Sequence, residues 1–452
     1  MKRIKILIYS LLCCICLLSN GCMEDFLDYF PEDKITDANF PQGESDIKLL
    51  VNGVYAQLRE TTIYDQGLFS FGALDAATPN AFMWGNTTLD KIGKGMASSS
   101  DKEIITFRWT RCYSIIFRAN YLLKSIEKVK LTEEQKNMYV GEAHFLRGLA
   151  YATLVESYGG VPLILSDITT EEARVIARSS TEDIWKQVIH DYDIAIANLK
   201  KDAPESGRAT KGAALGMKMR ALLYQGKYKD VLTVVDEIDQ LERYGLFPSY
   251  ERLFQATNEN NKEVLFDVQY IKGENSQGCF LDQYCGTGTG NWTRGSRYVP
   301  TENLVNAYET IDGSPINPND PYTNRDPRLA FTVVLPGSYI LGYRFPNYIY
   351  PGGAFNHPGN PLKYLSTRKY RVANEVDLPV AGQSYINNIV VRYADVLLSK
   401  AEALIEIGGS VDEAVALINR IRTEREDVKI TKISLGISRE EARERLRKER
   451  RI

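Results

Sequence analysis

A cysteine near the N-terminus has the surroundings that predict a covalent modification. Lys2 and Arg3 precede an almost wholly apolar run, residues 6–18, which is too short to span a bilayer core of about 30 Å. The run ends at Gly21-Cys22. We therefore expect cleavage before Cys22 and acylation of its thiol, which would anchor the chain on a membrane. Ser19 stands where the usual cleavage box has leucine, so an ordinary signal peptide with an incidental cysteine stays open.

Aromatic side chains in irregular stretches are the candidates for ligand binding. The chain has 27 Tyr, 16 Phe and 4 Trp. Tyrosine combines a flat apolar face with a polar tip, which suits sugars because their CH faces stack and their hydroxyl groups need hydrogen bonds. Loops on a rigid scaffold commonly carry such sites, although each aromatic ring has inward packing as its alternative. A Tyr-rich stretch, residues 339–355, is a third candidate region. The first two stretches are rich in Gly and Asn, and they supply six candidate residues: Asp75, Trp84, Asn86, Trp292, Arg294 and Tyr298.

Catalytic and metal chemistry leave weaker signals. Glycoside hydrolysis needs two carboxylates about 5–5.5 Å or about 6.5–9.5 Å apart. The 58 acidic residues single out no such pair, so a surface glycoside hydrolase stays an alternative. The three His residues lack metal-ligand spacing, and we expect neither a metal nor a cofactor. Cys279 and Cys285 form either a disulfide or two separate thiols.

The composition argues against nucleic acid as a partner. Removal of residues 1–21 leaves 431 residues with 52 basic and 58 acidic side chains, a formal net charge of −6. Phosphate binding favours a basic surface instead. Hydrophobic content of 44% is a globular value, and no later apolar run approaches membrane-spanning length. We therefore expect a body held at the membrane through its lipid anchor alone.

Helical periodicity predicts most of the elements that must position these side chains. In 45–60, Ser45 is the expected cap, and in 131–158 Thr132 and Gln135 have the spacing of a capping box. Thr181 is the expected cap of the helix at 181–199. Residues 61–100 and 249–388 are irregular, apart from short pieces near 263–270 and 331–335. The expected helices are 45–60, 109–129, 131–158, 181–199, 210–225, 228–241, 388–407, 411–423 and 438–452.

Two of the predicted helix pairs share one turn pattern. The pair 210–241 turns at Gly226, and the pair 388–423 turns at Gly408-Gly409. Each has an apolar or aromatic residue two positions after a glycine and a small apolar residue five positions after it. This is typical of tetratricopeptide helix hairpins, in which small residues allow close packing. A generic helical hairpin gives the same pattern, so the prediction is a mainly α protein with a tetratricopeptide-like helical-pair scaffold.

A series of short strings along the whole chain resembles the SusD/RagB family of Bacteroidetes outer-membrane lipoproteins. Glu24 and Asp25, directly after Cys22, resemble the acidic export tag of surface lipoproteins in that phylum. Each string is weak by itself, and their order and spacing carry the resemblance. The strings are Asp25-Phe26-Leu27-Asp28, Ile35-Thr36-Asp37, Arg118-Ala119-Asn120-Tyr121-Leu122-Leu123, residues 142–151, Tyr158-Gly159-Gly160-Val161-Pro162-Leu163, Asp326-Pro327-Arg328-Leu329 and residues 392–403.

The resemblance implies a non-catalytic surface lipoprotein that captures glycans or peptides. It also implies a partner, a SusC-like TonB-dependent outer-membrane barrel that receives the ligand, and a location at the cell exterior. A protein-binding helical adaptor without a small ligand is a further alternative. The resemblance also implies a C-terminal segment beyond residue 452, so the chain looks truncated. The expected division is signal peptide 1–21, lipidated arm 22–44, helical region 45–248, irregular ligand-presenting segment 249–388, and helical pair with a last helix 389–452.

Overall fold

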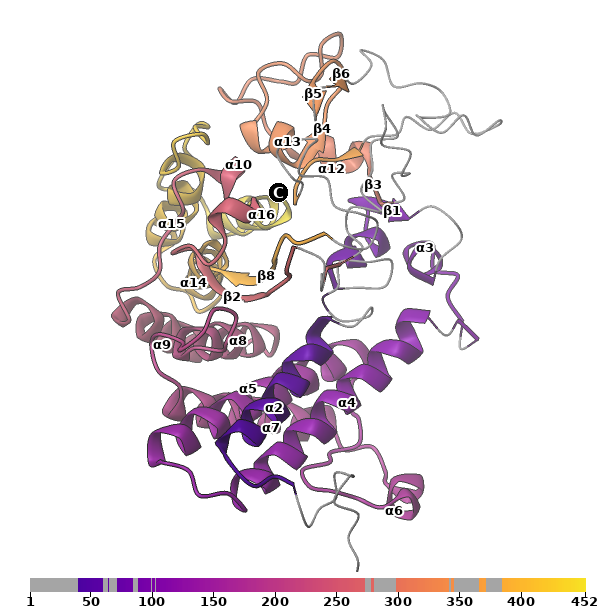
Figure 1. Cartoon of the computed structure of the whole chain (residues 1–452). Helices are drawn as coiled ribbons and strands as arrows, with labels where there is room; N and C mark the ends of the chain where they lie inside the picture. Colours follow the sequence, from indigo (N-terminus) through magenta and orange to yellow (C-terminus); the bar gives the residue numbers. More distant parts are fainter. Residues whose placement is uncertain are drawn as a thin grey trace, which may run out of the picture.

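The computed structural model is mainly helical, with the helices stacked along one side of the molecule (Figure 1). It describes residues 40–59, 64, 71–83, 88–98, 100–101, 103–272, 278–279, 298–340, 343–344, 366–370 and 384–452. In this part of the chain, no helix is both long and apolar enough to cross a membrane. Cys22 and Cys285 lie outside the described residues.

The first half of the scaffold consists of four long helices that pack side by side (Figure 1). The N-cap of α5 is the predicted capping box, because the Thr132 hydroxyl accepts from the Gln135 N–H and the Gln135 side chain accepts from the Thr132 N–H. Two predicted caps are wrong: α2 begins one residue before Ser45, and Ser180 rather than Thr181 caps α7. The four helices are α2 (Glu44–Ala56), α4 (Glu103–Ile126), α5 (Glu133–Tyr158) and α7 (Thr181–Asn198).

The two helix pairs with the shared turn pattern stack on each other. They are α8 (Lys211–Tyr224) with α9 (Tyr228–Gln240), and α14 (Tyr393–Glu406) with α15 (Val411–Thr423). Gly226 and Gly408 have φ values of 68° and 79°, a conformation that glycine adopts without steric cost. Helix α14 packs against both α8 and α9, so hairpins far apart in sequence are neighbours in space. The tetratricopeptide-like scaffold is confirmed.

The predicted helix 388–407 is wrong over its first five residues. Asn388–Arg392 is strand β8, which pairs antiparallel with β2 (Val264–Val268). Ile389, Val390 and Val391 are β-branched, and such residues lose less side-chain freedom in a strand than in a helix. The ladder lies against α8. It therefore ties the irregular half of the chain to the scaffold.

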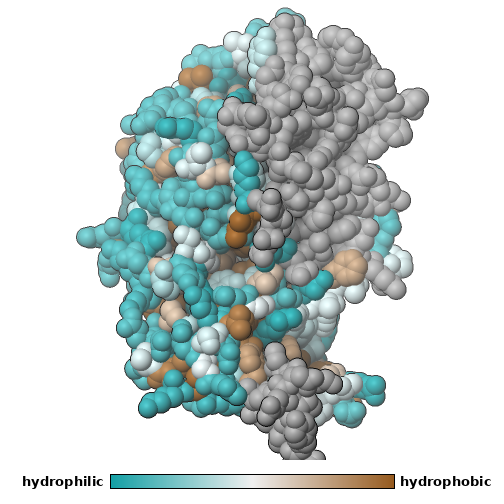
Figure 2. All heavy atoms as spheres, in the orientation of Figure 1, coloured by the Kyte–Doolittle hydropathy of each residue, from teal (hydrophilic) through white to brown (hydrophobic). Residues whose placement is uncertain are grey.

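The remaining described elements are α16 and a set of short helices and strands. Helix α16 (Arg439–Arg451) packs on α14 and α15, and α3 (Thr88–Gly93) and α6 (Thr170–Val175) lie in stretches where no helix was predicted. One apolar core extends from α2 through α16, and the described surface on the helical side of Figure 2 is largely hydrophilic. The other short elements are η2 (Gln57–Arg59), η3 (Phe71–Ala77), β1 (Ala81–Met83), α3 (Thr88–Gly93), α6 (Thr170–Val175), α10 (Tyr250–Leu253), η4 (Ala256–Asn258), β3 (Tyr298–Pro300), α12 (Glu302–Ala307), α13 (Pro327–Thr332), β4 (Val333–Val334), β5 (Tyr339–Ile340), β6 (Tyr343–Arg344) and β7 (Ser366–Thr367).

Candidate ligand-binding surface

A two-stranded sheet brings together the first two stretches that the sequence proposes for binding. Strand β1 pairs antiparallel with β3, and Met83 lies opposite Tyr298. Met83 is the residue before Trp84, and Tyr298 follows Arg294 by four positions. The 3₁₀ helix η3 packs against both strands, and β7 contacts β3. Segments separated by more than 200 residues therefore meet at one place, which the sequence alone did not show.

Asp75 and Tyr298 are neighbours on this surface. The Tyr298 hydroxyl lies close enough to the Asp75 carboxyl group to favour its ionised form and lower its pKa. Asp75 keeps exposed surface, so a ligand can reach it, although desolvation by the surrounding protein raises the pKa of this carboxyl group. The positive charge of Lys369 and the Tyr298 hydroxyl act in the opposite direction. The Asp75 carboxylate, beside the partly exposed Tyr298 hydroxyl, can accept further hydrogen bonds from a polar ligand.

Lys369 is a residue of this region that sequence reasoning missed. Its ammonium group lies 4.1 Å from the Phe254 ring centroid and 5.3 Å from that of Tyr250, and it donates to the Tyr250 hydroxyl at 3.1 Å. Burial raises the pKa of Tyr250, but the positive charges of Lys369, Arg392 and Arg328 outweigh it and leave the pKa below its usual value. No periodic pattern surrounds Lys369, so no sequence signal pointed to it.

The backbone next to Lys369 is strained. Tyr370 has φ 60°, in the left-handed region that side chains other than glycine rarely adopt. Its ring packs against Phe254 with the centroids 5.0 Å apart, and this contact holds the conformation in place. Strained positions of this kind often occur at binding sites, where the surrounding structure enforces them.

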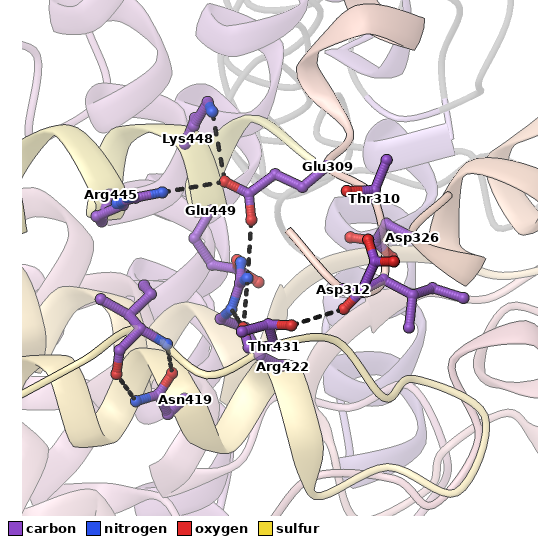
Figure 3. A network of polar contacts seen from close by, with 12 residues as sticks. Glu309, Thr310, Asp312, Asp326, Asn419, Arg422, Thr431, Arg445, Lys448 and Glu449 are labelled. Atoms are coloured by element: carbon purple, nitrogen blue, oxygen red, sulfur yellow. Dashed lines mark hydrogen bonds and ion pairs between the residues drawn. The ribbon is translucent and has the colours of Figure 1, made fainter. Parts of the chain in front are cut away.

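A network of ion pairs fixes the segment that carries this surface to the scaffold, and Figure 3 shows the part of it around Glu309 and Arg422. Arg328 of α13 donates to Asp326 and to Glu449 of α16, and Glu449 also accepts from Arg422 of α15. Glu309, between α12 and α13, accepts from Arg422 at 2.8 Å. Buried charges are tolerated when they are paired and hydrogen-bonded. The network therefore joins residues 309–328 to two scaffold helices.

Residues from other strings that carry the family resemblance also make contacts between helices of the scaffold. Arg147 of α5 donates to Asn120 of α4 at 2.8 Å and to Asp191 of α7 at 2.7 Å. Asp395 of α14 accepts from Arg220 of α8 at 2.7 Å and from Arg450 of α16 at 3.0 Å. These polar side chains hold helices together. They explain the strings as scaffold positions rather than as ligand contacts.

The structure brings together two of the six predicted ligand-binding residues, Asp75 and Tyr298. The other four lie outside the described residues, so their roles stay predictions: Trp84, Asn86, Trp292 and Arg294. In the third stretch, Tyr339 is 67% exposed at the start of the β5–β6 hairpin.

Known proteins match both halves of the chain. A family model described as "SusD family" matches residues 262–452, and one described as "Starch-binding associating with outer membrane" matches residues 25–223. A SusD-like protein of Formosa agariphila is 27% identical over 447 residues, which cover 93% of this chain and 82% of the relative.

Two solved structures from Bacteroides fragilis have the same fold. A SusD-like protein superposes with a TM-score of 0.79 at 29% identity, over 94% of this chain and 86% of that chain. A second, described as a SusD-like carbohydrate binding protein, has a TM-score of 0.77 at 26% identity, over 90% of this chain and 83% of that chain. The family models, the relatives and the shared fold show that this chain belongs to the SusD/RagB family.

Proposed function

We propose that this protein is a non-catalytic lipoprotein of the outer membrane that captures glycans, with peptides as the alternative ligand class. The observation that carries the proposal is the β1–β3 pairing, which places Asp75 against Tyr298 between two aromatic-rich stretches. Family membership supports it, since one matching family is described as starch-binding and associating with the outer membrane. A solved relative is described as carbohydrate binding.

The side chains of this surface fit the binding of a polar ligand with many hydroxyl groups better than the binding of a single charged group. Asp75 accepts hydrogen bonds, Tyr298 offers a ring face, and Lys369 supplies a positive charge nearby. Hydroxyl groups donate and accept hydrogen bonds, and CH faces of sugars pack on aromatic rings. We infer that Trp84 and Trp292 provide further stacking rings, with Asn86 and Arg294 as polar partners.

Calorimetric titration of the protein without its leader, against oligosaccharides and peptides, tests ligand capture. Asp75→Ala and Tyr298→Phe should each weaken binding by about tenfold, which corresponds to about 1.4 kcal/mol, the scale of one hydrogen bond to a charged group. Asp236→Ala is the matched control, because Asp236 is an exposed aspartate of α9. Variants that bind like the unmodified protein would contradict the assignment of this surface.

The same mixtures should be assayed for new reducing ends. Binding without product supports capture, whereas product release would establish a glycoside hydrolase instead. A folded protein that binds no ligand but co-purifies with an outer-membrane barrel would support the adaptor alternative.

We further propose that the captured ligand passes to a SusC-like TonB-dependent barrel and that Cys22 carries the lipid anchor. Residues 22–44 would then form a lipidated arm and residues 249–388 the ligand-presenting segment. Metabolic labelling with a radioactive fatty acid should label the unmodified protein and not Cys22→Ser. Labelling of both proteins would contradict the anchor, and failure of the barrel to co-purify would contradict the partner.

A further inference from the structure

A cavity of about 560 Å³ lies between α2, the loop that joins α7 to α8, and the end of β2. A smaller cavity of about 180 Å³ shares the wall formed by residues 205–208, Phe266 and Asp267. The larger volume lies within the range of about 300–1,000 Å³ that is usual for small-molecule sites. Among the described residues that line it, none belongs to η3, β1 or β3. The cavity is therefore separate from the candidate ligand-binding surface.

The loop wall of this cavity is firmly held in place. Arg208 donates to Glu142 of α5 at 3.0 Å and to Asn52 of α2 at 2.9 Å, and its guanidinium group lies 5.6 Å from the Tyr55 ring centroid. The Tyr55 hydroxyl accepts from the Ala209 N–H at 2.9 Å. These contacts tie the loop to two helices, so the cavity exists before any ligand binds. A preformed site loses less conformational entropy on binding.

Asp267 is a buried carboxylate in the wall of the cavity, only 4% exposed. Its described partners are amides rather than cations, namely Asn387 at 3.0 Å and Gln269 at 2.6 Å. A carboxylate has about four lone-pair positions, so two donors leave acceptor capacity for a ligand. Burial raises the pKa of Asp267 to about 6, and the group is therefore largely ionised at neutral pH.

The lining of the cavity carries equal numbers of positive and negative side chains, and it combines polar with apolar residues. Arg59 and Arg208 face the same space as Glu205 and Asp267. A strongly anionic ligand would meet the two carboxylates, and a cationic ligand would meet the two guanidinium groups. A purely apolar ligand would leave these polar groups without water, which costs free energy. The apolar part of the wall includes Ile271, which is 59% exposed, and Ala56, whereas Phe266 and Val268 are only 3% and 4% exposed.

We propose that this cavity is a second binding site and that it takes a neutral polyhydroxylated ring, such as a monosaccharide unit. Hydroxyl groups donate to the Asp267 and Glu205 carboxylates and accept from the Ser206 hydroxyl. The CH face of the ring packs on Ile271, an exposed apolar side chain of the lining. This site does not depend on the β1–β3 surface, and either site can fail without the other.

Saturation-transfer NMR with glucose, galactose, mannose and N-acetylglucosamine tests the site, with glucose 6-phosphate and glucosamine as charged probes. Ala56→Phe fills the cavity from α2, and Ser206→Tyr fills it from the loop, where Ser206 is exposed. Leu49→Phe is the matched control, because Leu49 lies on the same helix, is 64% exposed and is not part of the lining. Thermal melts verify that each variant folds.

The expected result is saturation transfer to a neutral sugar in the unmodified protein and in Leu49→Phe, with at least a fivefold loss in both filling variants. The filling variants are also made in the Asp75→Ala background, where the β1–β3 surface is weakened, and there they should still lose at least fivefold of the remaining transfer, which separates the cavity from the β1–β3 surface. No transfer to any neutral sugar, equal transfer in the filling variants, or binding of the charged probes alone would overturn the proposal.

Discussion

Replacement of Glu449 by glutamine tests whether the ion-pair network, part of which is drawn in Figure 3, holds residues 309–328 on the scaffold. Glu449 is 4% exposed and accepts from both Arg328 and Arg422, which are themselves 2% and 5% exposed. Glutamine keeps the shape and one acceptor oxygen but removes the negative charge between two buried guanidinium groups. Both arginines then lose a charged partner that water cannot replace.

The expected cost is about 3 kcal/mol, at the lower end of the range for breaking a buried ion pair. For about 400 folded residues the entropy of unfolding is about 0.8 kcal/mol per kelvin, so this corresponds to a fall of about 4 °C in Tm. Glutamine retains one hydrogen bond, which is why the upper end of the range is not expected.

Differential scanning calorimetry and urea unfolding measure the effect, with Glu444→Gln as the control on the same helix. The side chains of Glu444 and Arg447 are 69% and 66% exposed, and exposed pairs contribute only about 0–1 kcal/mol. Replacing both Arg328 and Glu449 by methionine should cost at least as much, because the buried Asp326 then loses its arginine partner as well. Equal Tm values for Glu449→Gln and Glu444→Gln would refute the reasoning.

Two further predictions concern the loop beside the cavity and a buried carboxyl group. Gly207 has φ 83°, and a Cβ there would lie 2.3 Å from the Gln269 Cγ, so Gly207→Ala should cost about 2 kcal/mol in urea unfolding, against about 1 kcal/mol for Gly313→Ala. Gly313 has φ 77° but no atom near its Cβ position, and equal costs would contradict the steric argument. Burial raises the pKa of Glu142 to about 7, so the folded state binds more protons than the unfolded state between pH about 4.5 and about 7, and this group makes stability fall as pH rises through that range. Thermal melts from pH 5 to pH 8 should show a flatter dependence for Glu142→Gln, and an unchanged dependence would contradict the assignment.

The helices could be predicted because their signals are local. The capping box at Thr132 and Gln135 and the glycine turns of the two hairpins depend on residues within one helical turn of each other. The prediction failed at Asn388–Arg392, where the apolar residues fitted the spacing of a helix as well as that of a strand. Pairing with Val264–Val268 made the segment a strand. Strand pairing over more than 100 residues has no local sequence signal.

Part of the candidate site could be predicted as well. Asp75 and Tyr298 were selected separately, as a polar and an aromatic residue in irregular stretches, and the structure places them close together. Lys369 was missed because its position beside Phe254 and Tyr250 depends on how distant segments pack. The cavity beside Asp267 was missed for the same reason.

The sequence by itself determined the helical scaffold, the hairpin turns and the resemblance to the SusD/RagB family, because periodicity, capping and short strings are read within a few residues. The tertiary structure decided which of the charged side chains are structural. Only the fold pairs Arg328 of α13 with Glu449 of α16. It likewise pairs Asp395 of α14 with Arg220 of α8 and Arg450 of α16. It also decided where the proposed binding surfaces lie, because they are built from α2, β1, β2 and β3, which only long-range packing brings together.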